Sequence, residues 1–153
     1  MSPSEVFLAL VHGICDGRLD DVVDLYAEKT DVSHPFDPLR GPGYSSRAEL
    51  AAHFARRPAR QTLKARPQNI RIHETRDPEV IVAEFEYAID NLETGTSSAY
   101  PCIFVMRVRY GKIVASRDYV DHLGSAAARG SLGDLLSEIG KRRSAQGAST
   151  PEA

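Results

Sequence analysis

Residues 111–124 read Gly-Lys-Ile-Val-Ala-Ser-Arg-Asp-Tyr-Val-Asp-His-Leu-Gly and predict a strand that follows a turn and carries a carboxylate at its centre. Side chains alternate between the two faces of a strand. The face that carries Asp118 therefore also carries Ser116, Val120 and His122. A carboxylate on an inward face is costly unless it is paired, hydrogen-bonded or protonated. Asp118 is thus a candidate for chemistry, provided that its face lines a cavity.

The chain has 153 residues, which suit one domain with its own core. Its net charge is −2 without a long basic block, so neither nucleic acid nor an anionic membrane is expected as a partner.

Cys15 and Cys102 match neither a disulfide framework nor a zinc site, and we expect reduced, mostly buried thiols. The start of the chain lacks a signal-peptide pattern, and no apolar run approaches the roughly 18 residues of a membrane span. We predict a cytoplasmic protein without cofactor or metal.

Helical periodicity comes first along the chain and strand periodicity follows. Apolar residues recur at three and four positions in 3–15, 18–28 and the segment that Ser46 caps, with a lid-like loop between at 36–46. Four extended segments follow, at 63–75, 79–90, 97–110 and 112–123. A last short helix is expected near 131–140, and 141–153 is expected to be a disordered polar tail. This order predicts one α+β domain over 1–140, with helices on one side of a mainly antiparallel sheet.

Alternation orients two of the strands. Segment 79–90 places an apolar set inward (Ile81, Ala83, Phe85, Tyr87 and Ile89) and an acidic set outward. In 97–110 the inward set is Tyr100, Cys102, Phe104 and Met106, because Arg107 and Arg109 need water. We expect these arginines to pair with Glu84 and Glu86 across the strands. Both faces of 112–123 are mixed, so periodicity alone does not orient Asp118.

Several segments of the chain resemble the nuclear transport factor 2-like superfamily, in its SnoaL-like and ketosteroid-isomerase-type branch. The matching motifs lie at 17–27 (Gly-Arg-Leu-Asp-Asp-Val-Val-Asp-Leu-Tyr-Ala), 32–36 (Val-Ser-His-Pro-Phe), 47–54 (Arg-Ala-Glu-Leu-Ala-Ala-His-Phe), 111–114 and 117–119. Together they cover most of residues 5–124. The resemblance implies a cone-shaped α+β barrel, in which a curved sheet wraps around three N-terminal helices and encloses an apolar pocket. The fold hosts enzymes and binding modules alike, so it does not fix the function.

The resemblance also implies which residues face the pocket. The family positions that point into it match Ser116, Asp118 and Val120. The position that holds the aspartate base of ketosteroid-isomerase-type members is His34 here, and the oxyanion-hole positions match Leu10 and Phe104, which disfavours a steroid isomerase. The Arg-x-Asp part of the epoxide-hydrolase pattern is missing from 105–110. The remaining His and Asp are similar to those of SnoaL-type polyketide cyclases and phenazine-biosynthesis members.

We therefore predict catalytic roles for Asp118 and His34 in a cyclase or isomerase of secondary metabolism. Both groups can exchange protons near neutral pH, which suits proton abstraction next to a carbonyl of a hydrophobic polyketide-like or aromatic substrate. The predicted substrate-binding residues are Phe36, Phe54, Phe85, Tyr87, Tyr100, Cys102, Phe104, Met106, Ser116, Val120 and His122. Such a step needs neither metal nor nucleotide.

Other interpretations stay open. Asp118 can bond backbone groups and only close the sheet, and the same pocket suits a binding module that does no chemistry. The outer sheet face suits a scaffold or a homodimer, because apolar Val80, Val82, Ile103 and Val105 lie there among charges. Residues 31–37 contain metal-ligand types without a second pair to complete four ligands. The arginines at 56, 57, 60, 66 and 71 are interpreted as a solvated face.

Overall fold

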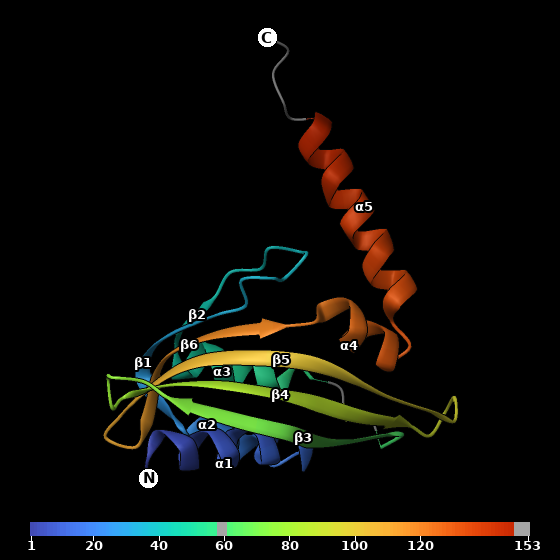
Figure 1. The fold of residues 1–153 in the computed structure, drawn as a ribbon. Coiled ribbons are helices and arrows are strands. Elements are labelled where there is room, and N and C mark those ends of the chain that lie inside the picture. The colour runs from blue at the N-terminus through green and yellow to red at the C-terminus, as the bar shows by residue number, and fades with distance from the viewer. Residues whose placement is uncertain (58–60, 149–153) are drawn as a thin grey trace.

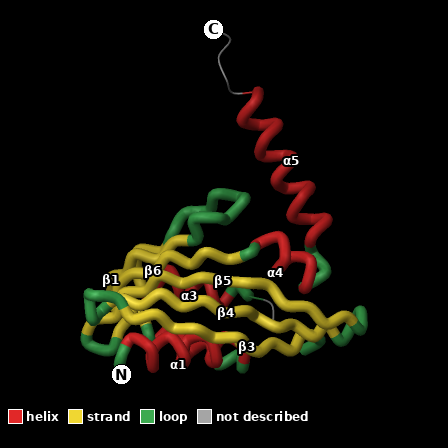
Figure 2. The backbone as a smooth tube through the Cα atoms, viewed as in Figure 1, coloured by secondary structure: helices red, strands yellow, loops and turns green. Residues whose placement is uncertain are grey.

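A curved six-stranded sheet dominates the computed structural model, of which we describe residues 1–57 and 61–148 (Figures 1 and 2). Its strands are β1 (Tyr26–Ser33), β2 (Tyr44–Ser46), β3 (Leu63–Glu74), β4 (Val80–Asn91), β5 (Thr96–Arg109) and β6 (Lys112–Val120). The spatial order is β2-β1-β6-β5-β4-β3. All neighbours are antiparallel except β1 and β6, which are parallel. The predicted α+β class with a curved, mainly antiparallel sheet is confirmed, although the sheet is not closed.

Helices cover one face of the sheet, and further helices follow its last strand. They are α1 (Pro3–Cys15), α2 (Leu19–Asp24), α3 (Arg47–Ala55), α4 (His122–Ala128) and α5 (Leu132–Ala148). Ser2 and Glu5 form a capping box before α1, and the Ser46 side chain caps α3. Figure 1 shows α1, α2 and α3 on the same side of the sheet, with α5 projecting away from it. None of the helices in the described ranges is long and apolar enough to cross a membrane.

The core lies between α1 and the concave face of the sheet. Phe7 is completely buried, and its ring meets those of Phe85 and Phe104 edge-on at 5.2 and 6.2 Å between centroids. The inward sets predicted for the two central strands are buried as predicted, and the register places Phe85 opposite Cys102 and Tyr87 opposite Tyr100. These contacts join the first helix to the strands that hold the site.

Several boundaries differ from the sequence predictions. The helix predicted at 18–28 ends at Asp24, because Tyr26 begins a strand that pairs in parallel with β6. Helix α4 was not predicted. Helix α5 continues past residue 140 to Ala148. Within this continuation Arg142 donates to the backbone carbonyl of Leu39 at 2.9 Å. The last part of the predicted tail, 149–153, lies outside the described residues.

The expected cross-strand pairing of the arginines of β5 with Glu84 and Glu86 is wrong. Arg107 binds Asp77 and Glu79 at 2.8 and 2.9 Å, and Glu79 also accepts from the second arginine of this strand. The register explains the difference, because Val80 lies opposite Arg107 and the acidic turn before β4 is then the nearest source of carboxylates. Such exposed pairs contribute little to stability.

Candidate functional site

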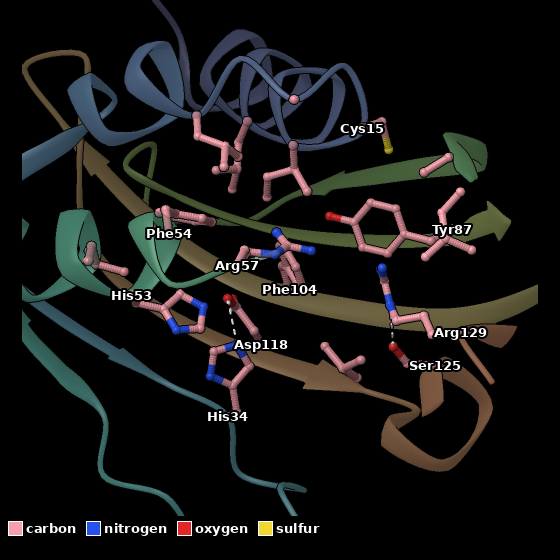
Figure 3. Close-up of a pocket in the computed structure, with 18 of the residues that line it drawn as sticks. Cys15, His34, His53, Phe54, Arg57, Tyr87, Phe104, Asp118, Ser125 and Arg129 are labelled. Carbon is pink, nitrogen blue, oxygen red and sulfur yellow. Dashed lines mark hydrogen bonds and ion pairs between the residues drawn. The ribbon is translucent and has the colours of Figure 1, made fainter. Parts of the chain in front are cut away.

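A cavity of about 750 Å³ lies between the helices and the concave face of the sheet. This volume is within the range of ligand sites for small molecules, about 300–1,000 Å³. Its apolar wall comes from both the helices and the strands: Leu10, Ile14, Leu19, Val32, Leu50, Phe54, Leu63, Ala65, Phe104 and Val120. Polar and ionisable side chains enter it at two places, one around Asp118 and one around Arg57 (Figure 3).

Asp118 projects from β6 into the cavity, opposite Phe104 of β5. Its side chain is 8 % exposed, and it accepts a hydrogen bond from the Ser116 hydroxyl through Oδ1. Burial raises the pKa of the Asp118 carboxyl from 3.8 to about 7, although the bond from Ser116 and the charge of Arg117 both lower it. A carboxyl in this state gives up and regains a proton near neutral pH.

His34 lies just beyond the end of β1 and faces Asp118. Its Nε2 is 3.7 Å from Oδ2 of the carboxyl, as the dashed line in Figure 3 shows. Burial lowers the pKa of His34, against the opposing charge of Asp37. The imidazole is therefore neutral at pH 7, while Asp118 is close to half protonated. When Asp118 is protonated the two groups carry no charge, and passing that proton to His34 would create a carboxylate–imidazolium pair.

Two further histidines surround this pair. His53 accepts from or donates to the Tyr44 hydroxyl through Nδ1 at 2.8 Å, and burial lowers its pKa. The ring of His122 lies 6.1 Å from that of His34 between centroids. Its Nε2 is buried and has no hydrogen-bond partner within the described part of the chain. A polar atom buried next to a cavity in this way is available to a ligand.

The second polar group lies across the cavity from His34. Figure 3 shows the guanidinium groups of Arg57 and Arg129 pointing toward the middle of the cavity, with the Tyr87 ring beside them. Arg129 donates to the Tyr100 hydroxyl at 3.3 Å and to Ser125 Oγ at 3.4 Å. One end of the cavity thus carries acid–base groups and the other carries positive charge.

The structure brings together eight of the side chains predicted for the site from the sequence. Those that line the cavity are His34, Phe54, Tyr87, Tyr100, Phe104, Asp118, Val120 and His122. Phe85, Cys102, Met106 and Ser116 are buried beneath the lining, where they pack or, for Ser116, hold the carboxylate. Phe36 is 66 % exposed and meets the Tyr119 ring edge-on outside the cavity, because the loop after Pro35 turns away from the site. Burial raises the pKa of the Cys102 thiol to about 12, which suits a packing role.

Sequence reasoning missed Tyr44, His53, Arg57 and Arg129. The interpretation of Arg57 as part of a solvated face is wrong, since it lines the cavity, whereas Arg66 and Arg71 are exposed as predicted. Residue 60 lies outside the described residues. A signal was present for His53, which lies one residue before Phe54 on the predicted third helix. No local pattern pointed to Arg129, because α4 itself was not predicted.

Comparisons with known proteins agree with this architecture. The family model described as SnoaL-like domain matches residues 7–116. A candidate isomerase from Bacillus subtilis is 21% identical with a TM-score of 0.72, over 84% of this chain and 93% of that one. A candidate polyketide cyclase from Pseudomonas putida is 17% identical with a TM-score of 0.65, over 84% and 98%. The Δ5-3-ketosteroid isomerase of a Mycobacterium species is 19% identical with a TM-score of 0.60, over 78% and 93%. No curated protein matches the chain.

Proposed function

The chain belongs to the SnoaL-like domain family, and we propose that it is a cofactor-independent isomerase or cyclase that moves protons on an apolar small molecule. The observation that carries this proposal is the position of Asp118, buried at one end of a cavity and 3.7 Å from His34. We place the substrate among polyketide-like or aromatic ketones, in secondary metabolism. The apolar wall of the cavity suits such a molecule.

In the proposed mechanism, the ionised form of Asp118 takes a proton from a carbon next to a carbonyl group. The C–H electron pair moves into the carbonyl and gives an enolate, while the carboxyl becomes neutral. Return of the proton to a different carbon completes an isomerisation. In a cyclisation the enolate carbon instead attacks a second carbonyl, and the resulting alkoxide takes the proton back from Asp118. His34, neutral at pH 7 and 3.7 Å from Asp118, donates a hydrogen bond to the enolate oxygen.

A base with a pKa of about 7 suits this chemistry at neutral pH. A carboxyl with an ordinary pKa is a weak base toward carbon acids, whereas this buried one is stronger and is still about half ionised near pH 7. The Ser116 hydroxyl fixes one oxygen of the carboxylate and leaves the other free to face His34 and the cavity. The carboxylate proposed as the base is therefore held in one orientation and has a pKa of about 7.

Deuterium exchange tests the proposal without knowledge of the natural substrate. The probe is 2-tetralone, an apolar aromatic ketone with acidic protons next to its carbonyl, followed by proton NMR in D₂O. We expect the wild-type protein to accelerate exchange, Asp118→Asn to reduce that acceleration by about 100-fold or more, and His34→Ala to reduce it by about tenfold. Glu86→Gln on the outer sheet face serves as the control, and we expect it to match wild type. Equal exchange by wild type and Asp118→Asn would contradict the proposal.

A binding module without catalysis is the second candidate. It is favoured by Leu10 and Phe104, apolar residues that line the cavity where related isomerases hold the donors that stabilise an enolate. Calorimetry with 2-tetralone separates the two functions. Binding without exchange, with an affinity that Asp118→Asn changes by less than about threefold, would favour the binding module.

We further propose that the protein forms a homodimer through the outer face of the sheet. Ile103 of β5 is 41% exposed at the centre of that face, and its partner in β4, Glu84, is also exposed. Val82 and Val105 flank it as a facing pair. Sedimentation at micromolar concentration tests this, with Ile103→Lys expected to give the monomer. A wild-type monomer would contradict the proposal.

A further inference from the structure

The enolate of the proposed reaction carries its negative charge on an oxygen, which needs hydrogen-bond donors. Donors that are already in place stabilise such a charge as it develops in the transition state. Phe104, which lies opposite Asp118, and Leu10 line the cavity without a polar side-chain atom. His34 supplies one N–H, and its Nε2 is 3.7 Å from the carboxyl. A second donor beside this histidine would complete the site.

Tyr44 and His53 form a hydrogen-bonded pair in the wall of the same cavity. Tyr44 begins β2, and His53 lies in the last turn of α3. The Tyr44 hydroxyl is 2.8 Å from Nδ1 of His53, and the two rings are 4.9 Å apart between centroids. Both side chains line the cavity, and the Tyr44 ring is 6.4 Å from that of His34. The pair is therefore close to the groups proposed for proton transfer.

The turn that joins β2 to α3 holds this pair in place. Ser46 caps α3 by accepting from the Glu49 N–H at 3.1 Å, and the Glu49 carboxylate accepts from the Ser45 N–H at 2.6 Å. The backbone carbonyl of Tyr44 accepts from the hydroxyl of Thr30 in β1 at 3.3 Å. These bonds fix the backbone around both side chains before any ligand binds.

The proton shared by the pair belongs to Tyr44. Burial raises the pKa of Tyr44 and lowers that of His53, so both side chains are neutral at pH 7. A phenol is the more acidic donor and an imidazole nitrogen is the better acceptor, so the hydroxyl donates to Nδ1. A neutral imidazole carries one N–H, and the bond at one nitrogen decides where that proton lies. The proton of His53 is therefore on Nε2.

Nε2 of His53 faces the reacting groups. Figure 3 shows the His53 ring directed toward Asp118. Within residues 1–57 and 61–148 the hydrogen bond of this ring is the one at Nδ1, which leaves the N–H at Nε2 for a ligand. The positive charges of Arg57 and Arg56 lower the pKa of His53, and the same charges favour a negative oxygen beside the ring.

We propose that His53 donates a hydrogen bond from Nε2 to the enolate oxygen of the substrate, and that Tyr44 positions the ring for this contact. His34 and His53 then hold the oxygen from two directions while Asp118 holds the transferred proton. The inference rests on the proposed function, because an enolate forms only after a proton is removed. It restricts the substrate to ketones whose oxygen reaches the β2–α3 side of the cavity while the neighbouring C–H reaches Asp118.

Proton exchange of 2-tetralone measures what His53 contributes. We expect His53→Ala to reduce the acceleration by at least about tenfold, in kcat rather than in KM, because the charge on oxygen develops only in the transition state. His53→Gln keeps an N–H near the position of Nε2, whereas His53→Asn keeps only an acceptor near Nδ1 for Tyr44. We therefore expect His53→Gln to recover most of the activity and His53→Asn to behave like His53→Ala. Recovery by His53→Asn but not by His53→Gln would show a structural role and overturn the inference.

Tyr44→Phe tests the direction of the hydrogen bond within the pair. This variant leaves the N–H of His53 in place without fixing the ring, so we expect a smaller loss of exchange than in His53→Ala. A larger loss in Tyr44→Phe than in His53→Ala would make the hydroxyl the donor and overturn the assignment.

His12→Ala is the matched control. Like His53, His12 is a histidine in the last turn of a helix, but it is exposed and lies outside the cavity. The two substitutions therefore remove the same side chain from the same kind of position. We expect His12→Ala to match wild type in exchange. Equal losses in His12→Ala and His53→Ala would overturn the inference.

Binding of 2-naphthol tests the donor without any proton transfer. This probe has the shape and the oxygen of the enol of 2-tetralone, and naphthalene lacks the oxygen. Both are titrated by fluorescence into Asp118→Asn, whose neutral amide represents the protonated carboxyl. We expect the further change His53→Ala to weaken 2-naphthol binding by about three- to tenfold, as loss of a neutral hydrogen bond implies, and to leave naphthalene binding unchanged. Equal weakening of both probes would indicate apolar packing and overturn the inference.

The inference and the proposed function fail separately. Binding of 2-naphthol that depends on His53, without exchange of 2-tetralone by wild type, keeps His53 as the donor to the ligand oxygen and refutes the proton transfer. Exchange that depends on Asp118 but is the same in wild type and His53→Ala keeps the proposed function and refutes the donor.

Discussion

Replacing Asp118 by asparagine is expected to stabilise the protein at neutral and alkaline pH, although the residue lies in the site. The pKa of this carboxyl is 3.8 in ordinary surroundings and about 7 in the folded protein. Each pKa unit corresponds to 1.36 kcal/mol, so holding the ionised form in its buried position costs about 4 kcal/mol. Asparagine has nearly the same shape and carries no charge, so it avoids this cost.

The pH dependence has a definite sign. Between about pH 4 and pH 7 the folded protein binds more protons at Asp118 than the unfolded chain, so wild-type stability falls as pH rises through this range. The loss is about 1.4 kcal/mol per pH unit and is complete above about pH 7. The asparagine variant lacks this loss, so the difference between the two proteins grows from pH 4 to 7 and then stays constant.

Thermal unfolding followed by circular dichroism, between pH 4.5 and 8.5, measures this difference. About 3.3 kcal/mol of the loss falls between pH 4.5 and 8.5. For a chain of this size 1 kcal/mol corresponds to roughly 2–4 °C, so we expect the melting-temperature difference to grow by roughly 7–13 °C across the range. A constant difference at low pH, from altered bonding of the amide with Ser116, does not affect the slope. A melting-temperature difference that is independent of pH would refute the reasoning.

Two other substitutions test separate parts of the structure. Ser116→Ala removes the hydroxyl that lowers the pKa of Asp118, so we expect that pKa to rise above 7, as measured by carbon-13 NMR of the aspartate carboxyls; an unchanged or lower value contradicts the contact. Phe7→Ala deletes a completely buried ring that packs on Phe85 and Phe104, and we expect a loss of about 3–5 kcal/mol in urea unfolding. A loss below about 1 kcal/mol would place this ring outside the core.

The fold was largely predictable because its central strands carry clean alternation. Phe85 and Phe104 lie in apolar sets whose opposite faces carry charges, so the inward face followed from the pattern alone. The stretch from residue 26 was harder, because helix and strand are both compatible with its sequence and the parallel pairing with β6 decides between them. Long-range pairing of this kind leaves no local signal.

The site residues on or next to regular strands were predictable, because the family resemblance implied which strand face points into the pocket. Asp118 and His34 lie together, on β6 and just after the parallel strand β1. Phe36 was placed wrongly because a loop fixes its direction, and alternation does not extend into a loop. Arg57 and Arg129 come from the ends of separate helices, and only the three-dimensional packing shows that they share a cavity.

The pH profile of 2-tetralone exchange tests the central claim, proton transfer by Asp118, most directly. We predict that the wild-type rate rises with pH to a plateau, with a midpoint near 7 that reflects ionisation of this carboxyl, and that Asp118→Asn abolishes the pH-dependent component. A midpoint near 4, or the same profile in the variant, would contradict the assignment of Asp118 as the base.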